Sequence, residues 1–259
     1  MIRGIETATS AMRAQMARQE VLARNLANST TAGYKEEFAP IDGFSANINR
    51  SQRAEWLGFA RWDTGRPHIG SMGTGVGISR VAVNFRQGII QQTHRPLDVA
   101  LAGDGFLEVR TVEGDYFFRG GALHVDANRR LVTDEGFFVL DSQGEVITLG
   151  EGEIAIDRDG TISVDGETVA QLSVVEFEPG TMLAKVGSTL YTIDDPDTAQ
   201  PMAAQDTEVR QGYLESSNVD EISTMTELAS GLRAYQASQR MLLAQDELLG
   251  KAVNEVGRV

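Results

Sequence analysis

The residues best suited to binding a metal ion are scattered along this sequence. The three histidines, His68, His94 and His124, lie far apart, and none has a second histidine or a cysteine at ligand spacing. The segment Asp157–Gly160 looks like the start of a calcium-binding loop, but its glycine stands at the wrong loop position and no glutamate closes the loop. A hairpin turn explains this segment better. The pattern therefore predicts no metal site.

A glycine-rich stretch at residues 70–77 has the composition of a phosphate-binding loop. It lacks the Gly-Lys-Ser/Thr ending, and residues 78–85 alternate like a strand where a phosphate loop would open a helix. We therefore interpret the stretch as a flexible glycine hinge. The sequence also has no cysteine nucleophile and no Gly-x-Ser-x-Gly elbow. Because no catalytic constellation is present, we expect neither an enzyme nor a cofactor.

Length and composition narrow the class of protein further. A chain of 259 residues can bury a substantial core in one or two domains. Its net charge of −14 argues against a nucleic-acid partner, because phosphates repel such a surface. No continuous apolar run is long enough for membrane insertion, and the N-terminus lacks the apolar core of a cleaved signal peptide. The absence of cysteine excludes disulfides.

The C-terminal stretch carries apolar residues at heptad spacing, which is typical of a helix that packs against another helix. Gln239 and Asp246 interrupt the series. The apolar positions are Met225, Leu228, Leu232, Tyr235, Leu242, Leu249, Val253 and Val256.

The N-terminal stretch from Ile2 to Asn28 is also predicted to be a helix, and the turn-forming residues 28–33 end it. Residues 1–35 carry five basic and two acidic groups, whereas residues 215–259 carry seven acidic and four basic groups. These opposite charges favour pairing of the two helices. The apolar stripe of the first helix contains Ile5, Ala8, Met12, Leu22 and Leu26.

Between these helices, residues 78–191 alternate with a period of two, and Gly- and Asp-containing turns punctuate them. We predict an antiparallel β domain, either a sandwich or an irregular barrel. The fold class is thus α+β: a discontinuous α-helical coiled-coil domain formed by both termini, plus a central antiparallel β-rich domain. The polar residues 192–212 are predicted to be a linker. The predicted boundaries are 1–35 for the N-terminal helix, 36–75 for an extended connecting segment, 76–210 for the β domain and 211–259 for the C-terminal helix.

Three ordered motifs resemble the flagellar rod and hook proteins. The segment Ala23–Lys35 is similar to their N-terminal motif Ala-Asn-Asn-Leu-Ala-Asn-x-x-Thr-x-Gly-Tyr/Phe-Lys, with Arg24 where the family usually has Asn. The second motif comprises Gln87-Gly88, Thr93 and residues 96–106, which resemble the segment leading into the family's β domain. The third comprises residues 211–220 followed by residues 233–237, which resemble the entry into the C-terminal helix.

The resemblance implies a structural subunit of the bacterial flagellar basal-body rod, which polymerises helically into the hollow drive shaft that transmits torque to the hook. The implied partners are further copies of the chain, other flagellar rod and hook subunits, and the flagellar type III export apparatus. Export would need no cleaved signal peptide. The distal rod is favoured slightly over the proximal rod.

The predicted assembly interface combines the apolar helix positions with the motif residues Asn25, Asn28, Gly33 and Tyr34. Asparagine and glycine can supply the local hydrogen bonds and the positive φ that a chain needs to leave a helix sharply. The helix positions are Ile5, Met12, Leu22, Leu26, Met225, Leu228, Leu232, Tyr235, Leu242, Leu249 and Val253.

Two other classes of protein stay open at this point. A surface binding module or adhesin with a coiled-coil stalk would show ligand affinity in its isolated β domain and would not need the N-terminal helix. An enzyme built on the β domain would need a catalytic constellation, which the sequence does not show.

Overall fold

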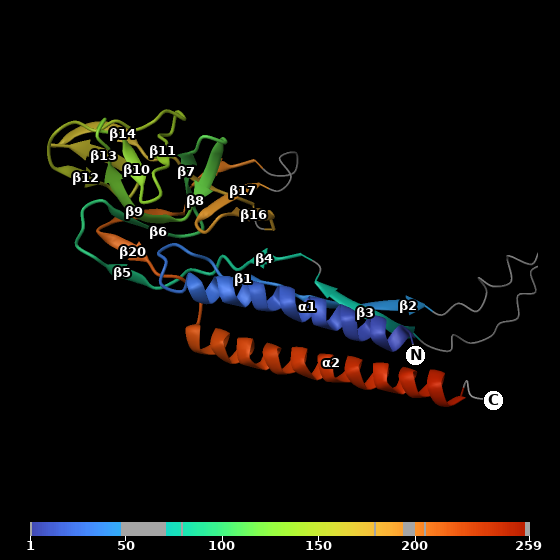
Figure 1. The fold of residues 1–259 in the computed structure, drawn as a ribbon. Coiled ribbons are helices and arrows are strands. Elements are labelled where there is room, and N and C mark those ends of the chain that lie inside the picture. Colours follow the sequence, from blue (N-terminus) through green and yellow to red (C-terminus); the bar gives the residue numbers. More distant parts are fainter. Residues whose placement is uncertain are drawn as a thin grey trace, which may run out of the picture. The chain divides into compact units, whose positions relative to one another are not determined.

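The computed structural model describes residues 2–47, 71–78, 80–178, 180–193, 200–204 and 206–256. The chain divides into two compact units. The helical unit comprises residues 1–23, 38–81 and 225–259, and the β unit comprises residues 24–37 and 82–224. Both predicted helices are confirmed, as α1 (Ile2–Ala27) and α2 (Glu221–Val256) (Figure 1). The α+β class with an antiparallel β-rich centre is therefore confirmed.

The β unit is built on an 11-stranded sheet in which every described pairing is antiparallel. Along its main path the strand order is β16-β17-β8-β7-β11-β10-β9-β6-β19, and β15 pairs with both β7 and β18. The bounds are β6 (Asp98–Ala102), β7 (Phe106–Arg110), β8 (Asp115–Phe118), β9 (Gly120–Val125), β10 (Leu131–Thr133), β11 (Phe138–Val139), β15 (Val174–Glu176), β16 (Leu183–Val186), β17 (Leu190–Ile193), β18 (Met202–Ala203) and β19 (Glu208–Gln211).

Smaller sheets complete the β unit. A three-stranded sheet has the order β12-β13-β14, and β20 pairs with β5. These strands are β5 (Ile90–Gln92), β12 (Ile154–Ile156), β13 (Thr161–Val164), β14 (Glu167–Gln171) and β20 (Tyr213–Glu215). In sequence, the short strand β1 (Glu37–Phe38) spans one division between the units, and β4 (Ala82–Val83) begins directly after another.

The core of the β unit follows the strand pattern that the sequence predicts. Alternate residues of β13, Ile162 and Val164, are buried, and residues 98–101 of β6 are buried on both faces. A second cluster is aromatic, and its rings meet edge to face at centroid distances of 4.8–5.7 Å. Such contacts add to the free energy gained from apolar burial. The rings are Phe85, Phe106, Phe117, Phe177 and Tyr191.

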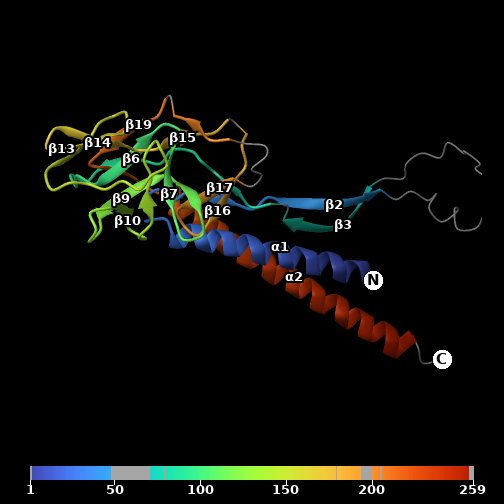
Figure 2. The same cartoon turned by 90° about the horizontal axis from the view of Figure 1, so that it is seen from above.

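In the helical unit, an antiparallel hairpin of β2 (Ile41–Asn47) and β3 (Ser71–Ile78) packs along α1 (Figure 1, Figure 2). The Ser10 hydroxyl accepts a hydrogen bond from the Val76 amide at 3.2 Å. A Cβ added to Gly75 would lie 2.7 Å from that hydroxyl, so glycine permits this close approach. The predicted glycine hinge is therefore wrong for residues 71–77, which form a strand.

Two other predictions about elements need correction. The predicted linker at 192–212 contains β18 and β19, which the sequence pattern misses because β18 is exposed and only Val209 of β19 is buried. The C-terminal helix begins at Glu221 rather than near 211, because Tyr213–Glu215 forms β20. The Asp220 carboxylate caps the helix by accepting hydrogen bonds from the amides of residues 222 and 223.

The residues that the structure leaves undescribed include His68, Gly70 and most of the predicted connecting segment at 36–75. Among the described helices, neither is long and apolar enough to cross a membrane.

Candidate assembly site and its buried support

The C-terminal helix α2 has one half-buried face and one exposed face. One face is a row of half-buried residues three and four positions apart: Leu228, Gly231, Tyr235, Ser238, Leu242, Gln245 and Leu249. Four of the predicted interface residues lie on this row. Met225 and Leu232 are instead exposed, with 44% of Leu232 accessible. The side chain of Val253 is outside the described residues.

The row on α2 approaches α1 through polar side chains. A Cβ added to Gly231 would lie 3.6 Å from the Gln15 side chain and 3.7 Å from Gln19. An ion pair joins Arg18 to Glu227 at 2.9 Å. A glycine gives no signal in an apolar pattern, which is why the sequence predicts Leu232 at this level instead. Coiled-coil packing of the two helices remains a prediction.

On α1, the predicted residues Ile5, Met12 and Leu26 are half-buried, and Leu22 is buried. Asn28 is half-buried, and its side-chain amide donates to the Arg24 carbonyl at 2.8 Å. This bond closes the last turn of the helix, as expected from the motif.

Asn25 is fully buried in the β unit, and its side chain makes three hydrogen bonds. Its Nδ2 donates to the Glu37 carbonyl at 2.7 Å, while its Oδ1 accepts from the Glu37 amide at 2.9 Å and from the Tyr34 hydroxyl at 3.1 Å. A buried amide that both donates and accepts hydrogen bonds in this way fixes one local geometry. Arg24, which departs from the family motif, pairs with the Glu37 carboxylate at 2.8 Å.

Gly33 occupies a position that only glycine fits. Its φ is +71°, and an added Cβ would lie 2.6 Å from the Gly120 carbonyl oxygen. Its amide donates to the Glu215 carbonyl at 2.8 Å. Gly33 therefore brings the N-terminal motif directly onto strands β9 and β20.

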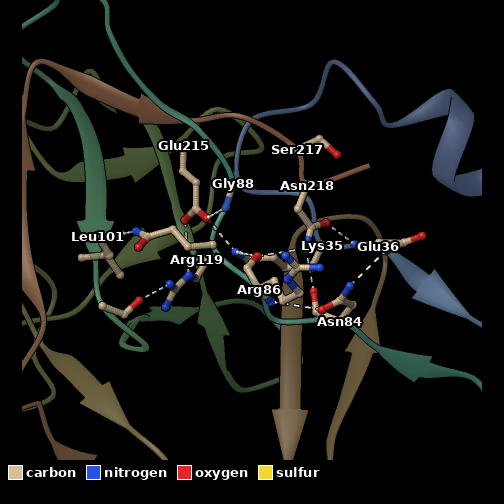
Figure 3. A network of polar contacts seen from close by, with 12 residues as sticks. Lys35, Glu36, Asn84, Arg86, Gly88, Leu101, Arg119, Glu215, Ser217 and Asn218 are labelled. Carbon is tan, nitrogen blue, oxygen red and sulfur yellow. Dashed lines mark hydrogen bonds and ion pairs between the residues drawn. The ribbon is translucent and has the colours of Figure 1, made fainter. Parts of the chain in front are cut away.

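Within the β unit, Lys35, Arg119 and Glu215 form a buried charge network (Figure 3). Lys35 Nζ donates to Glu215 Oε1 at 2.6 Å and to the Arg86 carbonyl at 3.0 Å. The other carboxylate oxygen of Glu215 lies 3.4 Å from Arg119 Nε, and the Gly88 amide also donates to Oε1. Burial lowers the pKa of Lys35, and its hydrogen bond to Glu215 partly opposes that effect.

Arg119 extends this network to the turn at residues 103–105. Its guanidinium donates to the carbonyls of Gly103 and Gly105. On the other side of the turn, the Thr207 hydroxyl accepts from the Gly105 amide at 2.9 Å. The Gly-Asp-Gly turn of the second family motif is therefore held from both sides.

Asn218 ties the third motif to the first. Its Oδ1 accepts from the Glu36 amide at 2.7 Å, and its Nδ2 donates to the carbonyls of Asn84 and Arg86 (Figure 3). All three motifs thus meet in one network, although Lys35 and Glu215 lie far apart in sequence.

Lys185 on β16 supports the same region. Its Nζ lies 3.2 Å from the centre of the Tyr34 ring, 3.3 Å from the Glu37 carboxylate and 3.0 Å from the Lys35 carbonyl. Burial lowers the pKa of Lys185 to about 8, against the raising effect of Glu37. Burial and the Glu37 charge raise the pKa of the Tyr34 hydroxyl.

Sequence reasoning missed Arg119, Lys185 and Glu37. A signal for Arg119 exists, since a single basic residue stands between the aromatic pair 117–118 and the glycine pair 120–121. Lys185 carries no comparable signal.

The chemistry that the buried network of Lys35, Arg119 and Glu215 provides is charge pairing and hydrogen bonding. Within the described residues, no group of His, Asp and Glu could hold a metal ion.

Comparison with known proteins identifies the family. Three family models match: "Flagella basal body rod protein" at residues 5–35, "Flagellar hook protein FlgE/F/G D1 domain" at 100–164 and "Flagellar basal body rod FlgEFG protein C-terminal" at 210–255. The chain belongs to the flagellar basal-body rod protein family, because these models match both its ends and its middle and a relative with 31% identity matches its full length.

Three relatives illustrate the similarity. The chain is 31% identical to the flagellar hook-basal body complex protein FlhO of Bacillus subtilis (strain 168), covering 100% of both chains. It is 30% identical to the flagellar basal-body rod protein FlgF of Caulobacter vibrioides, covering 93% of this chain and 92% of the relative. It is 29% identical to the flagellar basal-body rod protein FlgG of Borreliella burgdorferi, covering 98% of each.

Proposed function

We propose that this chain is a structural subunit of the bacterial flagellar basal-body rod, which polymerises helically into the hollow shaft that transmits torque to the hook. The observation that supports this most strongly is similarity to basal-body proteins over the full chain, both terminal helices included. An exposed apolar face on α2 agrees with contacts between subunits, because exposed apolar patches mark interaction sites.

The proposal has several finer parts. The subunit reaches the basal body through the flagellar type III export apparatus without a cleaved signal peptide, and it contacts other rod and hook subunits. It has no enzymatic activity. Between the two parts of the rod, the proposal takes the distal rod.

Deletion and complementation test this function. A host strain without the chain should lose hooks and motility, and a plasmid-borne copy should restore both. Electron cryomicroscopy of purified basal bodies should then show the chain as a repeating subunit of the shaft. A high copy number along a long tube supports the distal position, and a few copies near the motor would assign the proximal rod instead. Normal basal bodies in the deletion strain would overturn the proposal.

A further inference from the structure

Both helices of the helical unit carry the same pattern of charged and apolar residues on an exposed face. On α1, Arg13 is followed by Met16 three positions later and by Glu20 four positions after that. The same order and spacing recur on α2, at Arg240, Leu243 and Glu247. All six residues are exposed. Because helical residues three and four positions apart lie on one face, each set forms a continuous ridge, named here the α1 ridge and the α2 ridge.

Neither ridge is used for contacts inside the subunit. Met16 is 49% accessible and Leu243 is 60% accessible. Among the described residues, the only ion pair that involves a ridge charge joins Glu247 to Lys251 of the same helix, at 2.9 Å and with both side chains exposed. The contact between α1 and α2 of one subunit uses other positions, such as Arg18 and Glu227. Both ridges are therefore available to a partner.

The two ridges are complementary when their helices run antiparallel. The two charges of each ridge are about 10.5 Å apart along the helix axis, and both lie roughly 40–60° to the same side of the apolar residue. Antiparallel packing therefore places Met16 beside Leu243 and forms two opposite-charge pairs on one flank, Arg13 with Glu247 and Glu20 with Arg240. Such a pattern fixes the register of a contact.

A third pair of charges extends the match. On α1, Glu6 stands seven residues before Arg13, and on α2, Lys251 stands four residues after Glu247. In the antiparallel arrangement these two side chains lie about 4.5 Å apart along the axis, which is within the reach of a lysine and a glutamate. The order of charges is thus acid, base, acid along α1 and base, acid, base along the facing part of α2.

We propose that the α2 ridge of one copy of this chain packs antiparallel against the α1 ridge of a second copy. Within one subunit α1 and α2 are themselves antiparallel (Figure 1, Figure 2), as the contact of Arg18 with Glu227 and the position of Gly231 beside Gln15 and Gln19 require. The proposed contact therefore keeps both copies pointing the same way along the axis, as a shaft needs. The inference rests on the proposed rod function, because it assigns the partner of the exposed α2 face.

Each ridge could also pair antiparallel with the same ridge of another copy, but that contact differs in two ways. It is symmetric, so it turns the two copies end over end and closes as a dimer, whereas a contact between two different ridges continues as an open polymer. In an α2–α2 pair, moreover, Lys251 would lie level with Gln236 of the partner, between Arg233 and Arg240. The third opposite-charge pair is thus replaced by a meeting of like charges.

The register also gives the axial offset between the two copies. Within one subunit Arg18 lies beside Glu227, which puts Arg13 level with Leu232. In the proposed contact Arg13 lies level with Glu247, fifteen residues farther along α2. Copies that touch through these ridges are therefore displaced by roughly 22 Å along the helix axes.

Cysteine cross-linking tests the contact directly, because the chain has no cysteine of its own. Basal bodies from a strain whose chain carries both Met16→Cys and Leu243→Cys are treated with a short bismaleimide. We expect a ladder of cross-linked oligomers, since each chain offers one cysteine to each of two neighbours, and monomers from either single variant. The matched control pairs Met16→Cys with Leu248→Cys, which is equally exposed but lies about 140° away around α2.

The cross-linking outcomes separate this inference from the rod proposal. Dimers from Leu243→Cys alone would reveal a symmetric α2–α2 contact and overturn the proposed one. A shaft that contains the chain but gives no Met16–Leu243 adduct, or equal yields with the Leu248→Cys control, would also overturn it and leave the rod function standing. Absence of the chain from the shaft would overturn the rod function itself.

Charge reversal tests the register. Glu20→Arg and Arg240→Glu should each reduce the yield of complete rods at least tenfold, and the double variant should recover most of the yield. Arg233→Glu is the control, because it reverses the same charge seven residues earlier on α2, level with Ala27 of the facing α1. It should lower the yield much less. Melting of the purified subunit should be unchanged throughout, because these side chains are exposed. A double variant no better than the singles, or a control as damaging as Arg240→Glu, would show that Glu20 and Arg240 do not meet.

Discussion

Two ion pairs, one in each unit, show how differently the two parts of this molecule use charge. Lys35 and Glu215 in the β unit are each 1% accessible, and each also has one hydrogen bond with a backbone group, to the Arg86 carbonyl and from the Gly88 amide respectively. Arg18 and Glu227 in the helical unit have a similar separation but are 42% and 46% accessible. Distance alone would rank them as equals, whereas burial predicts that only the first is indispensable to the fold.

The two units also differ in how far their own contacts fix the conformation of the chain. In the β unit, polar groups are buried and paired, so the family motifs fix one path for residues 24–37 and 213–220. In the helical unit, α2 keeps apolar residues exposed and brings Gly231 near glutamine side chains. One unit is complete within a single subunit, and the other retains surface for further contacts. The four predictions below are ranked by their effect on the free energy of unfolding of the β unit.

Glu215→Ala should have the largest effect, because it leaves the cations Lys35 and Arg119 buried without their carboxylate. We expect a loss of about 3–5 kcal/mol of unfolding free energy, measured by urea denaturation followed by aromatic fluorescence. Glu227→Ala is the control from the exposed pair and should change stability by less than ~1 kcal/mol. Equal effects would mean that burial does not decide the strength of these pairs.

Gly33→Ala should come next, since it combines a strained φ with a collision against the Gly120 carbonyl. The expected loss is about 2–3 kcal/mol. Gly144→Ala separates the two causes, because Gly144 also has a positive φ but nothing lies near its added Cβ. It should cost only about 1 kcal/mol. If both variants melt alike, close packing against Gly120 contributes nothing.

Lys185 gives the third prediction, which concerns pH. Its folded pKa of about 8 lies below the ordinary value of 10.5, so the folded state binds fewer protons than the unfolded state between these values. The burial penalty is therefore fully present below pH 8 and is relieved as pH rises towards 10. Relative to Lys185→Met, the wild-type chain should gain stability from pH 8 to 10. A constant difference between the two chains across that range would contradict the pKa assignment.

The sequence predicts the elements whose pattern is local. Heptad spacing locates α2, the turn-forming residues 28–33 end α1 to within one residue, and alternation in residues such as 161–164 predicts antiparallel strands. Each of these signals is carried by residues that are neighbours along the chain.

The missing parts depend on neighbours that are distant in sequence. Nothing near Lys35 indicates that its partner is Glu215, or that Lys185 covers Tyr34. Strand β18 is too short and exposed to show alternation. On α2 an apolar pattern cannot show which leucines face the same subunit, because Gly231 and Ser238 fill the half-buried row without adding to the pattern.

Leu232→Asp should have the smallest effect on the subunit and a large effect on assembly. Leu232 is exposed on α2, so an aspartate there meets water in the isolated chain, and the β unit should melt within about 0.5 kcal/mol of the wild type. In a packed interface between subunits, the same carboxylate would be buried without a partner, which is strongly unfavourable at every repeat of the polymer. We therefore expect normal melting together with loss of rods and motility.

Leu242→Asp is the informative companion, because Leu242 is half-buried within the helical unit. Its replacement should also loosen α2 in the isolated subunit, which would be measured as faster proteolysis of that helix. A motile strain with intact basal bodies carrying Leu232→Asp would remove this residue from the assembly interface. Unfolding of the β unit in the same variant would show instead that α2 supports the β unit.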